Sequence, residues 1–359
     1  MQGHASGDCS ASCHVNAASP RGIRTMSPLT LLITLFALAL LFDFFNGFHD
    51  GANVVATIIA SRAMSARGAL VLAALANLAG PFLLGVAVAH TIGTEVVNPK
   101  AIGIAVLLAA LASACIWDLL TWYLRLPVSS SHALIGALLG AALAEVGPAA
   151  ILPHGLWKIA LALLLAPLAG LIGGLVVMGV TRRCLCDANP KVNLWLSRAQ
   201  ILTASALALS HGANDAQKTM GVLGLGLVLL GVTPVFVIPW WVMLLCACAI
   251  AMGTALGGSR LIRTLGLGLY RVRPIHGFTA QLASALVIVS ASLSGGPVSS
   301  TQVVSMAIAG SGAAERRSKV RWNVLGEIAV AWVLTLPLCA LLAALLYRVN
   351  KLLLTLGGG

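Results

Sequence analysis

Two aspartates in matching motifs are the residues of this chain best suited to chemistry. Residues 46–53 read Asn-Gly-Phe-His-Asp-Gly-Ala-Asn, and residues 211–218 read His-Gly-Ala-Asn-Asp-Ala-Gln-Lys. Aligning Asp50 with Asp215 also aligns a glycine three residues earlier, which indicates an internal duplication. Both motifs lie in long apolar stretches, where a carboxylate is costly and is usually paired or functional. We interpret both as cation or proton sites, with a structural ion pair or helix cap as the alternative.

Polar side chains flank both aspartates. Imidazole and amide groups can coordinate a cation or donate to an oxyanion. We therefore assign His49 to cation or proton coupling, and Asn53 and Asn214 to substrate binding. The alternative for the asparagines is polar contact between helices, and the alternative for His49 is a neutral, hydrogen-bonded histidine. Lys218 lies three residues after Asp215 on the same helical face, so it is a candidate partner for that carboxylate and a coupling residue.

Two hydroxyl triplets each follow a Pro-Val pair and open a short apolar stretch. Free backbone N–H groups at a helix start, together with the helix dipole, favour an anion, and three hydroxyls add donors. Two such starts, one from each copy, are predicted to face each other and hold a tetrahedral oxyanion. Ordinary N-capping is the alternative. The predicted substrate ligands are Ser129, Ser130, Ser131, Ser299, Ser300 and Thr301.

The position after each triplet differs between the copies, with His132 in the first and Gln302 in the second. We include Gln302 among the coupling residues. A hydrolase built on the first triplet and its histidine is excluded, because the chain has no G-x-S-x-G elbow and the second copy lacks the histidine. Further acids lie in apolar stretches at Asp43, Asp118 and Glu327. Each is either a proton site or a group paired at a helix end.

The elements that must position these residues are membrane helices. Hydrophobic residues make up 59% of the 359-residue chain, charged residues only 9%, and the mean hydropathy is +0.98. A soluble domain is nearer a quarter charged, so soluble enzymes and disordered chains are excluded. The apolar runs do not alternate with polar residues, which excludes an outer-membrane barrel. The sequence predicts an all-α polytopic membrane protein.

Breaks in hydropathy divide the chain into ten segments. Two of them, 28–61 and 199–231, are too long for one straight span and contain the motifs, so we expect interrupted helices there. Two others, 129–147 and 299–314, are short hairpin-like segments that open with the triplets. The ten segments are 28–61, 68–90, 100–122, 129–147, 156–180, 199–231, 236–257, 274–293, 299–314 and 322–347.

Basic residues fix the expected orientation. Lys and Arg follow every odd-numbered segment, whereas the loops 91–99, 148–155, 232–235 and 294–298, between the other segments, contain none; Arg348 and Lys351 after the tenth segment are the exceptions. The positive-inside rule places the first set in the cytoplasm and both termini outside. Each copy holds five crossings, an odd number, so the second copy enters the membrane inverted. Inverted repeats with interrupted helices are typical of secondary transporters, whose substrate sites lie near the midplane.

The predicted organisation has four parts. Residues 1–27 are a disordered extension or a mis-assigned start, 28–181 the first repeat, 182–198 a cytoplasmic linker, and 199–348 the second repeat. The net charge of +12 is attributed to cytoplasmic loops, and we expect no nucleic-acid partner. The eight cysteines form no pair at zinc-ligand spacing, so we expect no metal site.

With these motifs, the chain resembles the inorganic phosphate transporter (PiT) family, in its bacterial low-affinity branch. The resemblance covers about residues 28–350 and is carried by four stretches, 45–53, 126–136, 211–221 and 331–337. It implies cation-coupled import of inorganic phosphate across the plasma (inner) membrane. It also implies inverted repeats, a homodimer and an elevator-like motion, and no enzymatic activity or cofactor.

The resemblance does not identify the coupling ion. Lys218 places a fixed cation where a sodium ion could otherwise sit. This favours coupling to protons, or transport of a metal–phosphate complex, over sodium coupling. A sulfate permease on the same scaffold, or sodium-coupled phosphate symport, remains the alternative. Moving one charge through 100 mV is worth about 2.3 kcal/mol, so a phosphate dianion needs at least two accompanying cations.

Overall fold

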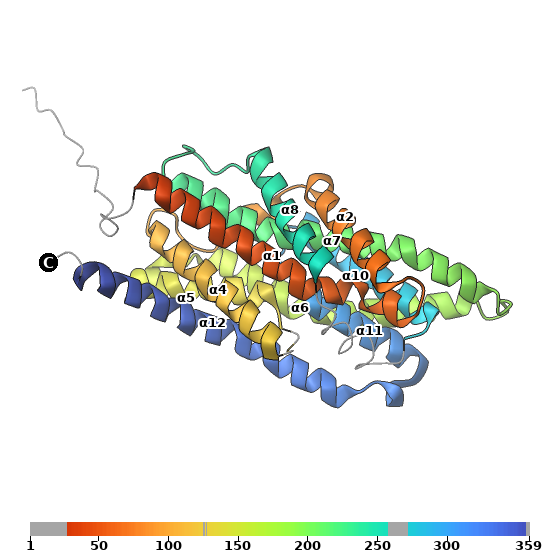
Figure 1. The fold of residues 1–359 in the computed structure, drawn as a ribbon. Helices are drawn as coiled ribbons and strands as arrows, with labels where there is room; N and C mark the ends of the chain where they lie inside the picture. The colour runs from red at the N-terminus through yellow and green to blue at the C-terminus, as the bar shows by residue number, and fades with distance from the viewer. Residues whose placement is uncertain (1–26, 125, 127, 258–271, 357–359) are drawn as a thin grey trace, which may run out of the picture.

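The computed structural model describes residues 27–124, 126, 128–257 and 272–356. Within these residues, one long helix corresponds to each of the ten predicted segments, and the all-α prediction is confirmed (Figure 1). The predicted first repeat contains α1 (Pro28–Ala60), α2 (Ala66–Leu84), α4 (Ile104–Leu124), α5 (Ser130–Glu145) and α6 (Pro153–Cys184). The second contains α7 (Val192–Leu229), α8 (Trp240–Leu256), α10 (Pro274–Leu293), α11 (Ser300–Arg316) and α12 (Trp322–Leu356). A short helix, α3 (Ala87–His90), and a π-helical turn (Thr91–Glu95) follow α2.

Six helices among the described residues are long and apolar enough to cross a membrane: α1, α2, α4, α6, α10 and α12. Their outward faces carry exposed leucines, as on α6, where Leu164 is 66% exposed while Leu163 beside it is 7% exposed. Apolar side chains turned outward in this way suit a lipid environment rather than water. The protein is therefore a multi-pass membrane protein, as the composition predicted.

The two predicted helix interruptions are wrong. Both α1 and α7 run as continuous α-helices through their motifs. The motif glycines serve close helix packing instead, since a Cβ on Gly47 would lie 2.1 Å from the carbonyl oxygen of Ile250 in α8. A Cβ on Gly212 would lie 2.4 Å from the carbonyl oxygen of Asn77 in α2. Small residues let helix backbones approach in a membrane, and here they do so without breaking either helix.

The two short helices have the predicted place and length. The hydroxyl of Ser129 accepts from the backbone N–H of His132 and caps α5, and Ser299 caps α11 in the same way through Gln302. Every residue of α5 from Ser130 to Ala142 is buried, so this helix is surrounded by other helices. It packs against α4 and α12, while α11 packs against α6. The polar starts of both helices are thereby enclosed within the protein.

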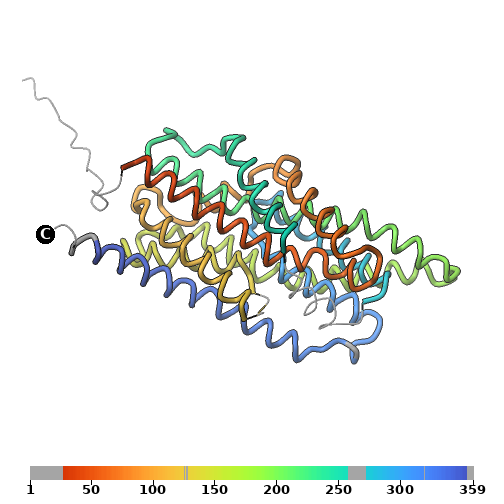
Figure 2. The backbone as a smooth tube through the Cα atoms, in the orientation of Figure 1, coloured from red at the N-terminus to blue at the C-terminus, as the bar shows by residue number. Residues whose placement is uncertain are grey.

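The two ends of the bundle hold different parts of the chain. Helix α1 begins and helix α12 ends at the same end of the bundle (Figure 2). The opposite end carries the basic turn between α6 and α7, where only residues 185–191 are outside helices. The predicted linker at 182–198 is therefore mostly helix. The predicted extension at 1–27 lies outside the described residues, except for Ser27, which caps α1. The inversion of the repeats stays a prediction.

Candidate functional site

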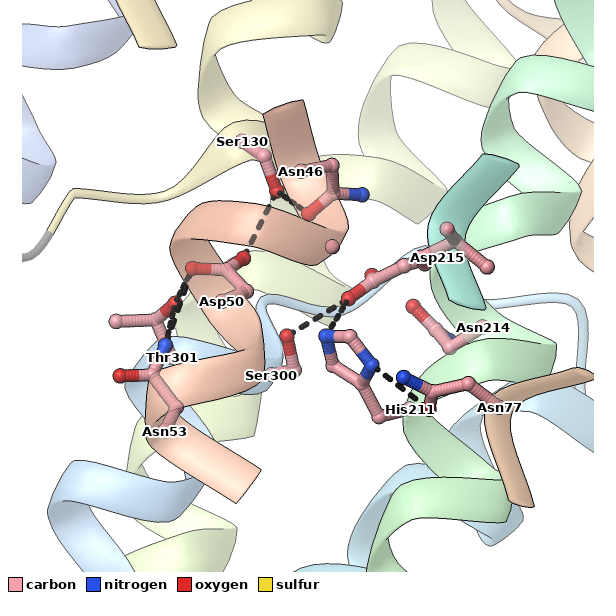
Figure 3. Close-up of polar contacts among 12 residues, drawn as sticks. Asn46, Asp50, Asn53, Asn77, Ser130, His211, Asn214, Asp215, Ser300 and Thr301 are labelled. Carbon is pink, nitrogen blue, oxygen red and sulfur yellow. Dashed lines mark hydrogen bonds and ion pairs between the residues drawn. The ribbon is translucent and has the colours of Figure 1, made fainter. Parts of the chain in front are cut away.

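The carboxylate of Asp50 is enclosed by donors from three helices. It is 1% exposed, and its Oδ1 accepts from Thr301 Oγ1 at 2.9 Å and from Asn53 Nδ2 at 3.0 Å. Its Oδ2 accepts from Ser130 Oγ at 3.1 Å (Figure 3). His49 Nδ1 lies 3.2 Å from Oδ1. Asn53 also donates to Thr301 Oγ1 at 2.7 Å. Helices α1, α5 and α11 therefore meet at this one carboxylate.

The carboxylate of Asp215 has more charged surroundings. It is completely buried, forms an ion pair with Lys218 through Oδ1, and accepts from Ser300 Oγ at 2.8 Å through Oδ2. His211 Nε2 lies 3.0 Å from the same Oδ2. A buried charge needs a partner and hydrogen bonds to be stable, and Asp215 has both. The predicted pairing with Lys218 is present in the structure.

The ammonium group of Lys218 has no free donor. Besides Asp215, it donates to Ser131 Oγ at 2.5 Å and to the backbone carbonyl of Val298 at 2.9 Å. Ser131 in turn donates to the same carbonyl at 3.0 Å. An ammonium group has three protons, and all three are used here. The lysine is thus a fixed cation that links the start of α5 to the residue before the α11 cap.

The starts of α5 and α11 meet between the two carboxylates. Thr301 of α11 reaches Asp50, while its neighbour Ser300 reaches Asp215 (Figure 3). Ser130 of α5 reaches Asp50, and Ser131 reaches the Lys218 that pairs with Asp215. The start of α11 therefore contacts both carboxylates directly, while the start of α5 contacts Asp50 directly and Asp215 through Lys218. The hydroxyls predicted to bind substrate and the acids predicted to bind cations form one network.

A candidate cation site lies between the carboxylates. Asp50, His211 and Asp215 each offer a ligand atom, and these atoms lie within 4.8 Å of one another. His211 Nδ1 lies 3.2 Å from Asn77 Oδ1, whose amide nitrogen donates to Thr254. This assigns the Nδ1 proton to the Asn77 contact, so Nε2 faces Asp215. In a neutral His211 the lone pair of Nε2 would face a carboxylate oxygen, and two carboxylates with one lysine would leave a net charge of −1, so this arrangement suits one further proton or cation.

Four predicted site residues lie elsewhere in the structure. The hydroxyls of Ser129 and Ser299 cap their helices. Asn214 donates to Ser292 Oγ at 2.9 Å and to the carbonyl of Gly296 at 3.4 Å, so its amide nitrogen contacts the end of α10 and the segment that leads into α11. The side chain of Gln302 lines an apolar cavity of about 680 Å³ between α6, α11 and α12.

The sequence interpretation missed three contributors to the network. His211 stands four residues before Asp215, one helical turn away on the same face, and that spacing is a signal that could have found it. Asn46 accepts from Ser130 at 2.9 Å and stands four residues before Asp50 in the matching place. The carbonyl of Val298 gives no signal, because a backbone acceptor cannot be read from residue type.

Buried carboxylates between membrane helices mark substrate and ion pathways, so this fold and site define, as a class, a membrane transporter. The comparison of the sequence with models of protein families identifies the family. The model of the phosphate transporter family matches residues 46–193 and 185–343, and the chain belongs to this family. The resemblance stated from the motifs is confirmed, and the protein is a transporter.

Bacterial relatives cover almost the whole chain. A protein of Bacillus subtilis named as a probable low-affinity inorganic phosphate transporter is 40% identical over 329 residues, 90% of this chain and 98% of the relative. One of Rhizobium meliloti with the same description is 41% identical over 319 residues, 88% of this chain and 96% of the relative. The solved structure titled the sodium-dependent phosphate transporter has a TM-score of 0.82 at 24% identity. It covers 90% of this chain and 99% of its own, and at that identity it shows the fold alone.

Proposed function

We propose that this protein imports inorganic phosphate across the plasma membrane as a cation symporter, with protons as the driving ion. The observation that carries the proposal is the shared network: the hydroxyls at the starts of α5 and α11 donate to the two carboxylates that are suited to bind cations. The hydroxyls that would bind phosphate are thus donors to the carboxylates that would bind the driving cations. Phosphate and its driving ions cannot bind independently in such a site.

The coupling mechanism follows from competition for donors. Without bound ions, Ser130 and Thr301 donate to Asp50, and Ser300 donates to Asp215. A proton or cation on a carboxylate removes its charge, and a hydrogen bond to a neutral acceptor is about half as strong as one to a charged acceptor. The hydroxyls, and the backbone N–H groups of the helix starts, are then released to an oxyanion. Cations bind first and phosphate follows.

Lys218 supports protons over sodium as the driving ion. It is buried and fully hydrogen-bonded beside Asp215, so the space next to that carboxylate already holds a positive charge. The remaining candidate site, between Asp50, His211 and Asp215, includes an imidazole nitrogen. Histidine changes charge near neutral pH, and sodium prefers oxygen ligands. Co-transport of a metal–phosphate complex is the second way to use this site.

The substrate class rests on hydrogen-bond donors. A phosphate dianion carries one proton and can donate, whereas sulfate cannot. A carboxylate at the helix starts that stays ionised when phosphate binds is an acceptor, and it would be left unpaired facing sulfate. The site chemistry therefore favours phosphate over sulfate. Both termini outside the cell, and a homodimer as the assembled form, complete the proposal.

Uptake of radiolabelled phosphate into proteoliposomes tests this function. We expect an inward proton gradient to drive accumulation at equal sodium on both sides, and unlabelled phosphate but not sulfate to compete. Asp215→Asn is expected to abolish uptake while the protein still reaches the membrane. The matched control is Glu95→Gln, because Glu95 pairs only with Lys158 away from the network. Wild-type uptake by Asp215→Asn would end the assignment, and competition by sulfate would move it to a general oxyanion carrier.

A further inference from the structure

A third carboxylate, Asp43 of α1, is buried apart from the paired carboxylates and has no part in the mechanism above. It precedes Asp50 by two helical turns, about 10 Å along the helix. Its side chain is 0% exposed. We propose that Asp43 is a separate proton-binding site that couples proton entry to phosphate transport. The inference rests on the proposed proton-coupled phosphate symport and adds a site to it.

Asp43 has too few partners for a charged group. Thr219 Oγ1 of α7 donates to its Oδ1 at 2.5 Å, and its Oδ2 has no hydrogen-bond partner among the described residues. No ion pair involves Asp43 in the described part of the chain. A buried charge that faces only a hydroxyl and the weak thiol donor of Cys246, with no cation paired to it, is costly. In this arrangement Asp43 therefore holds a proton.

The neighbouring groups offer no other way to neutralise it. The titratable groups that face Asp43 are Cys246 of α8, Cys115 of α4, and Asp215 and Lys218 of α7. Thiols are weak donors and carry no positive charge. Lys218 is the one cation among them, and its three protons are donated to Asp215, Ser131 and Val298. A proton is the remaining counter-charge.

The position of Asp43 along α1 places it on the predicted outer side of the paired carboxylates. Along α1 the chain passes Asp43 and then Asp50, while along α7 it passes Asp215 and then Thr219. Since Thr219 contacts Asp43 and Asp215 lies near Asp50, α1 and α7 run antiparallel here. Asp43 thus lies between the centre and the end of the bundle where α1 begins (Figure 1). A proton from that end, the predicted outside, reaches Asp43 before the centre.

The charge of Asp43, rather than its hydrogen bond to Thr219, couples this proton to the ion pair. Thr219 directly follows Lys218, so an ionised Asp43 attracts the lysine and competes with Asp215 for it. When Oδ2 binds a proton, an O–H bond forms, the charge disappears and the lysine stays with Asp215. When the site opens to the cytoplasm, this O–H bond breaks and the proton passes to water. One proton is carried per cycle, and no electron is transferred.

The test separates proton transfer from helix packing. Asp43→Asn keeps an acceptor for Thr219 but cannot carry a proton, whereas Thr219→Val keeps the acid and removes the hydrogen bond. Both variants and Glu95→Gln are reconstituted and compared in two assays. The first is phosphate exchange at equal pH, and the second is accumulation driven by a pH gradient. Asp43→Ser, which also lacks the acid, is the second removal variant if Asp43→Asn does not reach the membrane.

We expect Asp43→Asn to retain exchange near the wild-type rate and to lose gradient-driven accumulation. Thr219→Val and Glu95→Gln are expected to retain both activities. Gradient-driven accumulation by Asp43→Asn, or loss of exchange together with accumulation, would overturn the inference and leave Asp43 a packing residue. Wild-type exchange without any response to a proton gradient would also overturn it, while the phosphate assignment would stand. Absence of phosphate exchange in the wild type would instead refute the proposed function.

Discussion

Thr301 donates to the carboxylate of Asp50 at 2.9 Å, although the two residues lie 251 positions apart. Asp50 belongs to the first motif and Thr301 to the second hydroxyl triplet, so the contact joins the two halves of the chain. Its counterpart joins Ser131 of the first triplet to Lys218 of the second motif. Each half therefore completes the polar site of the other. A movement that separates the helix starts from α1 and α7 would open both contacts together.

Thr301→Val is expected to weaken phosphate transport strongly. The change keeps the shape of the side chain and removes the donor to Asp50 and the acceptor for Asn53. A hydrogen bond to a charged group contributes about 1.5–3 kcal/mol, which corresponds to roughly a 10- to 150-fold loss in phosphate uptake efficiency. Initial uptake rates at a series of phosphate concentrations measure this loss.

Ser305→Ala is the matched control for that substitution. Ser305 lies one turn further along α11, is 1% exposed, and its hydroxyl has no partner among the described residues. Its removal is expected to change uptake less than about threefold, because a hydroxyl without a partner contributes little. Equal losses in both variants would mean that α11 is sensitive to any substitution and that the Thr301 contact has no special part.

The sequence was sufficient for the elements and insufficient for their pairing. Hydropathy located all ten long helices, because each needs an apolar run of its own. The triplets located the starts of α5 and α11, because serine caps helices. The contact of Thr301 with Asp50 could not be predicted, since it depends on the position at which α11 packs along the length of α1. No local spacing records that offset.

The glycines show why one prediction failed. A glycine within a polar stretch is compatible with both a broken helix and a close helix crossing, and the sequence does not distinguish them. The difference depends on what lies opposite. For Gly47 it is the α8 backbone at Ile250, and for Gly212 it is the α2 backbone at Asn77. The motif glycines are thus explained by residues that are far away in the sequence.

Gly47→Ala is expected to destabilise the protein by about 1–3 kcal/mol, the usual cost of overpacking. The added methyl group would lie 2.1 Å from a backbone oxygen of α8, which cannot turn aside as a side chain could. A fall in the midpoint of thermal unfolding in detergent is the measurement. Gly179→Ala in α6 is the control, because its Cβ would meet no atom within 4 Å. A helical Gly→Ala change without a clash stabilises by up to about 1 kcal/mol.

The two glycine variants distinguish packing from hinge motion. If Gly47 allowed α1 to bend during transport, the alanine variant would keep its thermal midpoint and lose uptake. If it allows close approach, stability falls first and uptake follows the amount of folded protein. The 2.1 Å approach favours the second outcome. An unchanged midpoint for Gly47→Ala would contradict the packing explanation.

Lys218→Asn is expected to make the protein depend on sodium. Removing the lysine leaves Asp215 as a buried charge without its ion-pair partner, which costs about 3–5 kcal/mol when nothing replaces it. A sodium ion can take the place of the ammonium group, with the carbonyl of Val298 and the oxygens of Asp215 and Ser131 as ligands. A cation that binds only the folded protein raises its stability. Sodium chloride is therefore expected to raise the midpoint of thermal unfolding of Lys218→Asn more than choline chloride does.

Wild-type protein and Lys158→Asn, which breaks an ion pair at 3.1 Å outside the network, are expected to respond equally to both salts. Equal responses of Lys218→Asn to the two salts would show that the lysine does not occupy a cation position.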